Sequence, residues 1–182
     1  MRSERVGGAV TWGLLGAWAV HDLEELATVP WWLRRNVPEL RKRFPQVPEA
    51  VWRRAESMGA AEFAAAVGVM GVVVGTASAA GRFSGGRSGF YQGALTGFGL
   101  HGVVHMAQAA AVRGYTPGSV TAPLVVLPFT LWARGRLRKA GVLRPARPRD
   151  AVAGLAAAGA ATVASHVVAR RLLRPARPAV MT

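Results

Sequence analysis

The sequence of 182 residues contains no cysteine. This absence excludes a disulfide framework, a CxxC redox site, and zinc or iron–sulfur centres held by thiolates. Acidic residues are scarce too, because 9 Asp and Glu stand against 23 Lys and Arg, giving a formal net charge of +14. In a soluble protein such a charge points to nucleic acid. Here the basic residues form short clusters between long apolar runs, so we expect no role for nucleic acid.

Long apolar segments dominate the rest of the chain. A helix needs about 20 residues to cross the hydrocarbon core. The fourth apolar segment contains Pro123 and Pro128, which predict a kinked or re-entrant helix. The polar stretch 33–55 predicts a basic interfacial loop or a short surface helix. The sequence therefore predicts a single all-α domain over 1–182, a multi-pass helical bundle in the cell's inner (plasma) membrane. Its five expected transmembrane helices lie near 6–29, 58–80, 89–112, 119–134 and 150–169.

Small residues recur at four-residue intervals in two of the expected helices. Four residues turn a helix by about 400°, so each series stays on one slowly drifting stripe. Small residues let membrane helices approach closely, and the two stripes should therefore face the bundle interior. The stripes are Gly13, Ala17, His21 and Glu25 in the first helix, and Gly89, Gly93, Gly97, His101 and His105 in the third.

Four carboxylates lie within expected spans. Each charged carboxylate at mid-membrane costs about 2.5–3.5 kcal/mol on insertion scales, so something must compensate them. His21, Glu24 and Glu25 fall within roughly a 100° arc of one helix face, whereas Asp22 points about 100° away. Glu62 lies about one turn into the second expected helix.

Two histidines, His101 and His105, form an i, i+4 pair, a spacing that lets two imidazoles bind one metal ion. Alternation of the crossings brings these histidines and the carboxylates to one membrane depth, with His166 as a candidate fourth imidazole. The predicted metal ligands are His21, Glu24, Glu25, Glu62, His101 and His105.

Imidazole and carboxylate ligands without sulfur suit Fe, Mn or Zn. We expect a divalent metal cofactor, with iron as the first choice. Three carboxylates against two divalent ions make a dinuclear centre electrostatically reasonable, and a mononuclear centre stays open. Two other interpretations need no metal: an acid/base or proton-relay network, and a structural hydrogen-bonded cluster.

These motifs together resemble a known family. The stretch from His21 to Glu25, the pair His101 and His105, and the following Arg113-Gly-Tyr-Thr-Pro-Gly-Ser-Val-Thr-Ala-Pro look like the HXXEE family of small bacterial integral membrane proteins. The resemblance covers about residues 10–130. It implies a multi-helix membrane domain with enzymatic or metal-binding work at His21, Glu24, Glu25, His101 and His105. The Thr-Pro-Gly step within the third motif predicts a tight turn with proline at i+1 and Gly118 at i+2.

The function we expect is that of a membrane-embedded metal-dependent enzyme. A non-haem di-iron oxidoreductase acting on a lipophilic small molecule is the first hypothesis, with His21, Glu24 and Glu25 as catalytic residues. The alternatives are a metal-free acid/base isomerase or cyclase, a proton or cation transporter using the same cluster, and a non-catalytic membrane partner. Besides the substrate, the expected partner is membrane lipid, and formation of a homo-oligomer stays open.

Overall fold

The computed structural model describes residues 6–145 and 148–173. The described residues form α-helices and one short π-helix, and none of them is in a β-strand, which confirms the all-α class. The elements in chain order are α1 (Gly8–Arg43), α2 (Glu49–Glu56), α3 (Ala60–Phe83), α4 (Gly89–Val112), the π-helix η1 (Ala122–Val126), α5 (Leu127–Lys139) and α6 (Pro148–Leu172).

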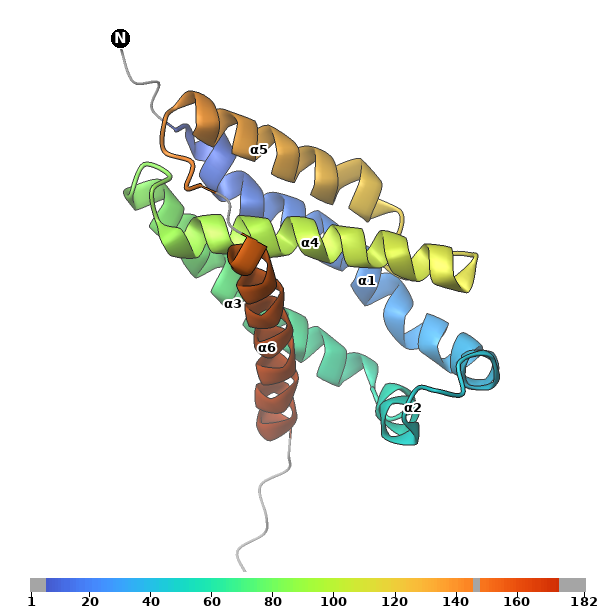
Figure 1. The fold of residues 1–182 in the computed structure, drawn as a ribbon. Helices are drawn as coiled ribbons and strands as arrows, with labels where there is room; N and C mark the ends of the chain where they lie inside the picture. Colours follow the sequence, from blue (N-terminus) through green and yellow to red (C-terminus); the bar gives the residue numbers. More distant parts are fainter. Residues whose placement is uncertain (1–5, 146–147, 174–182) are drawn as a thin grey trace, which may run out of the picture.

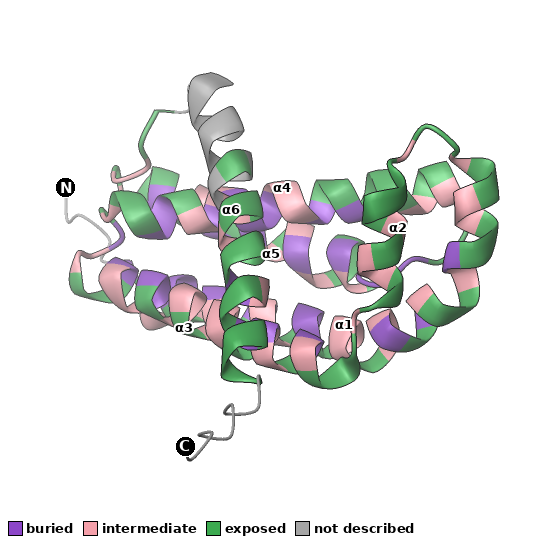
Figure 2. Cartoon of the chain, turned by 90° about the horizontal axis from the view of Figure 1, so that it is seen from below, coloured by how far each residue is buried: buried purple, intermediate pink, exposed green. Residues whose placement is uncertain are grey.

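The long helices form a bundle that the last helix crosses. Both α1 and α4 pack against α3 on one side and against α5 on the other. Helix α6 packs against α3 and α4 and crosses them steeply (Figures 1 and 2). Buried residues lie mainly on the faces that α1, α3, α4 and α5 turn toward one another, whereas the described side chains of α6 are mostly exposed (Figure 2). The interior between α1, α3, α4 and α6 is therefore the part of the fold in which a site can form.

The hairpin between α3 and α4 aligns these two helices. Gly85 and Gly86 take φ values of +61° and +86° in the turn, a region that favours glycine. The Ser88 side chain then caps α4 by accepting a hydrogen bond from the Tyr91 N–H at 3.3 Å. A Cβ at Gly81 would lie 2.5 Å from the Tyr91 ring, so the glycine lets α3 and α4 approach closely. This is the close contact that small residues permit between membrane helices.

The apolar core lies where α1 and α4 begin and α5 ends. The Tyr91 hydroxyl donates a 2.5 Å hydrogen bond to the Val10 carbonyl within this core. Burial of these side chains fixes one end of the bundle, and the histidine-rich part of α1 and α4 lies further along both helices. The core residues with the least exposure are Leu14, Tyr91, Leu95, Val126, Ala133 and Leu137.

Helix α1 runs on to Arg43 instead of ending near residue 29, although it contains two prolines. Contacts across the bundle hold the extension. The Trp32 indole N–H donates to the Tyr115 carbonyl at 2.9 Å, and the Arg43 guanidinium donates to the last two carbonyls of α4. The polar stretch 33–55 is thus not mainly a loop: it comprises the last turns of α1, a short connection and most of α2.

The fourth apolar segment is π-helical before it becomes α-helical. Pro123 lies within η1, and Pro128 occupies the first turn of α5, where its missing N–H is tolerated. The distortion agrees with the predicted kink, and the helix extends to Lys139 rather than residue 134. Basic side chains at its end do not stop a helix, and they favour its C-terminus.

Among the described residues, one helix is long and apolar enough to cross a membrane by length and composition. This helix is α3, whose most apolar window has a mean hydropathy of 1.9 and is 28% buried. Helix α1 carries three acidic residues and a histidine at its centre, and α5 has 13 residues. The predicted all-helical class is therefore confirmed, whereas the bundle of about five transmembrane helices stays a prediction, for which α3 has the length and composition of a membrane span.

Candidate metal site

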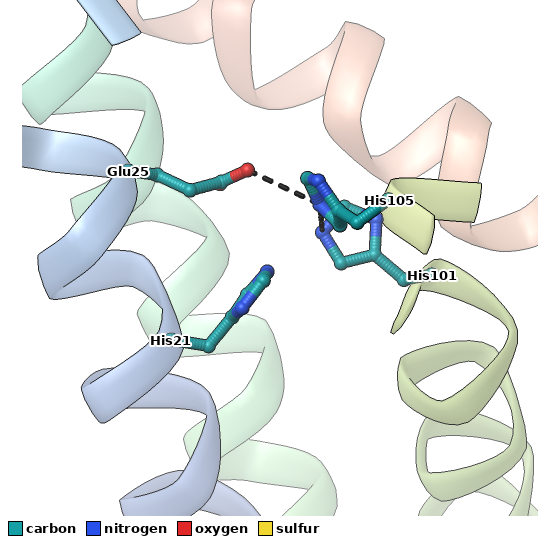
Figure 3. Close-up of side chains that lie close together, drawn as sticks. All are labelled: His21, Glu25, His101 and His105. Atoms are coloured by element: carbon teal, nitrogen blue, oxygen red, sulfur yellow. Dashed lines mark hydrogen bonds and ion pairs between the residues drawn. The ribbon is translucent and has the colours of Figure 1, made fainter. Parts of the chain in front are cut away.

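Three histidines and one glutamate meet between α1 and α4. His21 and Glu25 lie one turn apart on α1, and His101 and His105 lie one turn apart on α4. One ligand atom from each side chain lies within 4.8 Å of the other three, and all four side chains point toward one another (Figure 3). We call these four residues the His/Glu cluster. The i, i+4 spacing of both pairs places each pair on one helix face, as predicted.

The tautomer of His21 follows from its neighbours. The Thr121 hydroxyl lies 2.6 Å from Glu24 Oε2, and a carboxylate only accepts, so the hydroxyl proton points to Glu24. His21 Nδ1 lies 2.7 Å from the same hydroxyl oxygen and must therefore donate its own proton. That leaves Nε2 of His21 unprotonated. Nε2 is buried and has no hydrogen-bond partner among the described residues.

His105 of α4 contacts both His101 and Glu25. His105 Nε2 lies 2.9 Å from His101 Nε2 and 3.2 Å from Glu25 Oε1. The three imidazole rings lie with centroids 4.3–5.2 Å apart. Like charges at such distances repel strongly in a buried site, so the rings cannot all be protonated. The cluster instead offers several nitrogen lone pairs and one carboxylate to a cation.

Glu24 binds the loop that follows α4 rather than joining the cluster. Its carboxylate accepts hydrogen bonds from the backbone N–H groups of Gly118 at 3.1 Å and Thr121 at 2.8 Å. The Tyr115 hydroxyl donates to it at 2.9 Å. Burial and then the nearby Glu24 carboxylate raise the pKa of the Tyr115 hydroxyl, which keeps it protonated as a donor. The loop 115–121, which we call the clasp loop, is thus fastened to α1.

Gly118 presses the clasp loop onto the cluster. The N–H of Ser119 donates to the Thr116 carbonyl at 3.0 Å, and Gly118 has φ +81°. These features confirm the predicted tight turn and match a type II turn with glycine at i+2. A Cβ at Gly118 would lie 2.6 Å from the His105 ring and 2.9 Å from the His21 ring. The backbone therefore covers the two imidazoles directly.

Glu62 and His166, by contrast, lie outside the His/Glu cluster. Glu62 accepts from Arg170 Nε at 3.0 Å and contacts His166 Nδ1 at 3.3 Å, and it also pairs with Arg54. This ionic group joins α2, α3 and α6, and its cations compensate the Glu62 charge. The structure therefore brings four of the six predicted ligands together and leaves Glu24 and Glu62 in other roles.

The donor set fits a divalent metal ion. Ligand atoms bound at about 2.0–2.2 Å to one tetrahedral ion lie roughly 3.4 Å apart, so bound metal would draw the outermost atoms of the cluster inward by a small amount. The unpartnered His21 Nε2 is the strongest sign, because a buried nitrogen without a partner costs about 1–3 kcal/mol. The Thr121 contact to its other nitrogen is the kind of outer contact that orients metal-binding histidines.

Two residues that matter here, Thr121 and Gly118, are not among the predicted site residues. The predicted tight turn was a signal for both residues, because the glycine of such a turn lies close to the residues that the loop covers. Thr121, three residues after this glycine, contacts His21 of α1, and this contact is visible only once the loop is folded against the helix. Sequence spacing along one helix cannot show such a contact.

We predict that Thr121→Val weakens metal binding. The valine keeps the shape but removes the hydroxyl that orients His21, and outer contacts of this kind are worth about 10–100-fold in metal affinity. Thr116→Val is the matched control, because Thr116 is a buried threonine of the same loop whose hydroxyl has no partner among the described residues. Competition with a metal-binding dye measures both affinities. Equal affinities in the two variants would contradict the role given to Thr121.

The fold and site define the class: an all-helical chain with a three-histidine, one-glutamate cluster covered by a loop. The chain belongs to the family described as "Protein of unknown function with HXXEE motif", which matches residues 12–133. This range contains the whole cluster and the clasp loop, and it confirms the predicted resemblance. No curated protein and no solved structure matches the chain. The motif can now be divided: His21 and Glu25 belong to the cluster, and Glu24 holds the clasp loop.

Proposed function

We propose that the protein is a membrane-embedded, mononuclear non-haem iron enzyme, an oxidoreductase acting on a lipophilic small molecule. The metal ligands are His21, Glu25, His101 and His105. The observation that carries the proposal is the unpartnered, buried Nε2 of His21, in a cluster whose four residues each have one ligand atom within 4.8 Å of the other three. A divalent cation satisfies this nitrogen and compensates Glu25 at the same time.

One ion suits the cluster better than two. The dinuclear hypothesis needed three carboxylates, but the hydrogen bonds of Glu24 go to the clasp loop and those of Glu62 to cations. Glu25 is the single carboxylate left among the cluster residues. One divalent ion with one carboxylate keeps a net charge near +1, which a buried site tolerates better than two ions with one carboxylate.

Iron is the metal we propose for this ligand set. Imidazole and carboxylate ligands without sulfur suit Fe, Mn and Zn, and mixed histidine and carboxylate sites are typical of non-haem Fe(II) oxygenases. Bound iron would supply one-electron and oxygen chemistry. The residues of the chain would hold the ion, keep it under the clasp loop, and limit the access of water.

Exposed apolar surface supports the membrane part of the proposal. The apolar window of α3 is only 28% buried, unlike the core helix of a soluble protein, and it lies in the middle of the chain, unlike a signal sequence. Large apolar side chains are also exposed on other helices, including Leu23 at 63%, Leu124 at 70% and Leu131 at 71%. Extensive apolar exposure marks a membrane or protein contact, and a bilayer would cover these side chains.

Elemental analysis of the detergent-purified protein tests the proposal. We expect one equivalent of iron per chain, and the same content in Glu62→Gln, because Glu62 is outside the cluster. Two equivalents, with a loss in Glu62→Gln, would instead support the dinuclear centre. A metal-free protein after anaerobic purification would favour the acid/base isomerase or cyclase, and proton flux into vesicles would then favour the transporter.

A further inference from the structure

A cavity lies beside the His/Glu cluster, between α1, α3, α4 and α6. Its volume is about 380 Å³, within the range of about 300–1,000 Å³ that small-molecule sites occupy. Most of the wall is apolar, with aromatic rings from three of the helices. These rings belong to Trp18, Phe63, Phe90 and Phe98.

One part of the cavity wall is polar and belongs to the candidate metal site. Glu25 and His101 of the cluster line it, and Asp22 lies beside them. Asp22 is only 7% exposed and makes no hydrogen bond or ion pair with any residue in the described part of the chain. A largely buried carboxyl group without a protein partner is available to hydrogen-bond a ligand. The cavity supplies the space for such a ligand.

The rest of the cavity runs along α4. Gly89, Gly93 and Gly97 line it together with His101, and at 1.5 Å per residue this part of the helix rises about 18 Å. One leaflet of the hydrocarbon core is about 15 Å thick. A Cβ added at Gly93 would meet nothing within 4 Å. The stripe therefore leaves room for a chain at Gly93, whereas a Cβ at Gly89 would meet the Arg144 guanidinium.

We propose that this cavity binds a single-chain lipid with a hydroxyl or carbonyl head group, whose head contacts Asp22 next to the metal and whose chain lies along the glycines of α4. The proposal names the substrate class of the enzyme proposed above and rests on that function. Its shape argument is a mostly apolar space along α4, with the polar side chains of Asp22, Glu25 and His101 on one part of its wall and those of Ser165 and His166 on α6. Its chemical argument is Asp22, which can accept from a hydroxyl when ionised and donate to a carbonyl when protonated.

Photolabelling tests the site. The probe is 1-tetradecanol carrying a diazirine in mid-chain, added to the metal-loaded protein in lipid nanodiscs, with labelled residues located by peptide mass spectrometry. We expect labels at Val73, Val74 and Ala94 of the cavity wall. Unlabelled 1-tetradecanol should compete, and tetradecane should compete about tenfold less well, because it makes no hydrogen bond.

Two glycine variants separate the cavity from the outer surface. Gly93→Phe fills the chain part of the cavity and should lower labelling about tenfold, with a smaller loss in Gly93→Leu. Gly68→Phe is the matched control, because Gly68 is exposed on α3 and a Cβ there also meets nothing within 4 Å. Asp22→Leu should remove the advantage of the alcohol over the alkane, and Asp22→Asn, which keeps hydrogen-bonding groups, should retain it.

Labelling confined to outward residues such as Val72 and Leu124, or equal labelling in Gly93→Phe and Gly68→Phe, would overturn the proposal. Equal competition by tetradecane and 1-tetradecanol would overturn the role of Asp22. The metal content of the same samples keeps the two proposals distinct. Metal without cavity labelling defeats the lipid site alone, and cavity labelling without metal defeats the metal enzyme alone.

Discussion

Replacing His101 with alanine is expected to lower the affinity for a divalent metal about 100- to 1,000-fold. Metal sites with four protein ligands bind with about 10–16 kcal/mol, so an equal share is about 3–4 kcal/mol per ligand. The loss should fall in the upper part of this range, because His101 also contacts His105, whose Nε2 lies 2.9 Å away. Without that neighbour, the His105 ring loses one of the contacts that fix its position.

Titration with cobalt(II), whose visible absorption reports its ligands, measures this affinity. His166→Ala is the matched control, because His166 is also a partly buried histidine, but it contacts Glu62 instead of the cluster. We expect the control to bind metal like the unaltered protein. If both variants bound cobalt equally well, the ion would sit elsewhere and the cluster would be a structural network.

The sequence predicted the two i, i+4 pairs of the His/Glu cluster better than it predicted the complete set of metal ligands. Helical periodicity places His21 with Glu25, and His101 with His105, because four residues return a side chain to nearly the same face. The same periodicity also places Glu24 near that face. Only the clasp loop, which offers backbone N–H groups and a hydroxyl to one carboxylate, separates the role of Glu24 from that of Glu25. These contacts join residues about a hundred positions apart and leave no periodic signal.

Depth arithmetic placed Glu62 among the metal ligands, and the structure places it outside the His/Glu cluster. Depth says nothing about rotation around the bundle. Glu62 faces α6, where His166 and Arg170 meet it. The order of the helices around the bundle decides which helix Glu62 faces. The lengths of the apolar segments do not show that α6 crosses α3 and α4.

The small-residue stripes show a similar limit. They were expected to mark helix contacts, and Gly13 does lie close to another helix, since a Cβ there would lie 2.7 Å from the Phe129 ring of α5. Gly93 instead lines a cavity. A glycine permits either a close neighbour or an empty space, and the sequence around it does not distinguish them. The neighbouring helix decides, here α6, which crosses at a steep angle and leaves space beneath it.

The second large effect is expected at Gly118, where alanine should destabilise the fold by roughly 2–5 kcal/mol. A left-handed backbone costs a residue with a Cβ about 1–2 kcal/mol, and forcing an extra methyl group into a packed site costs about 1–3 kcal/mol. At Gly118 both apply, because φ is +81° and the new Cβ would lie 2.6 Å from the His105 ring. The imidazoles must then move, so metal affinity should fall together with stability.

Gly114→Ala separates this effect from a general intolerance of the segment after α4. Gly114 is exposed, has no positive φ, and a Cβ there meets nothing within 4 Å. Thermal unfolding of both variants, with and without metal, measures the difference. We expect Gly114→Ala to unfold like the unaltered protein and to gain the same stability from metal, whereas Gly118→Ala loses both. A Gly118→Ala protein that kept full metal stabilisation would mean that the clasp loop moves away from His21 and His105 without cost, and that its contact with the imidazoles does not hold them in place for the ion.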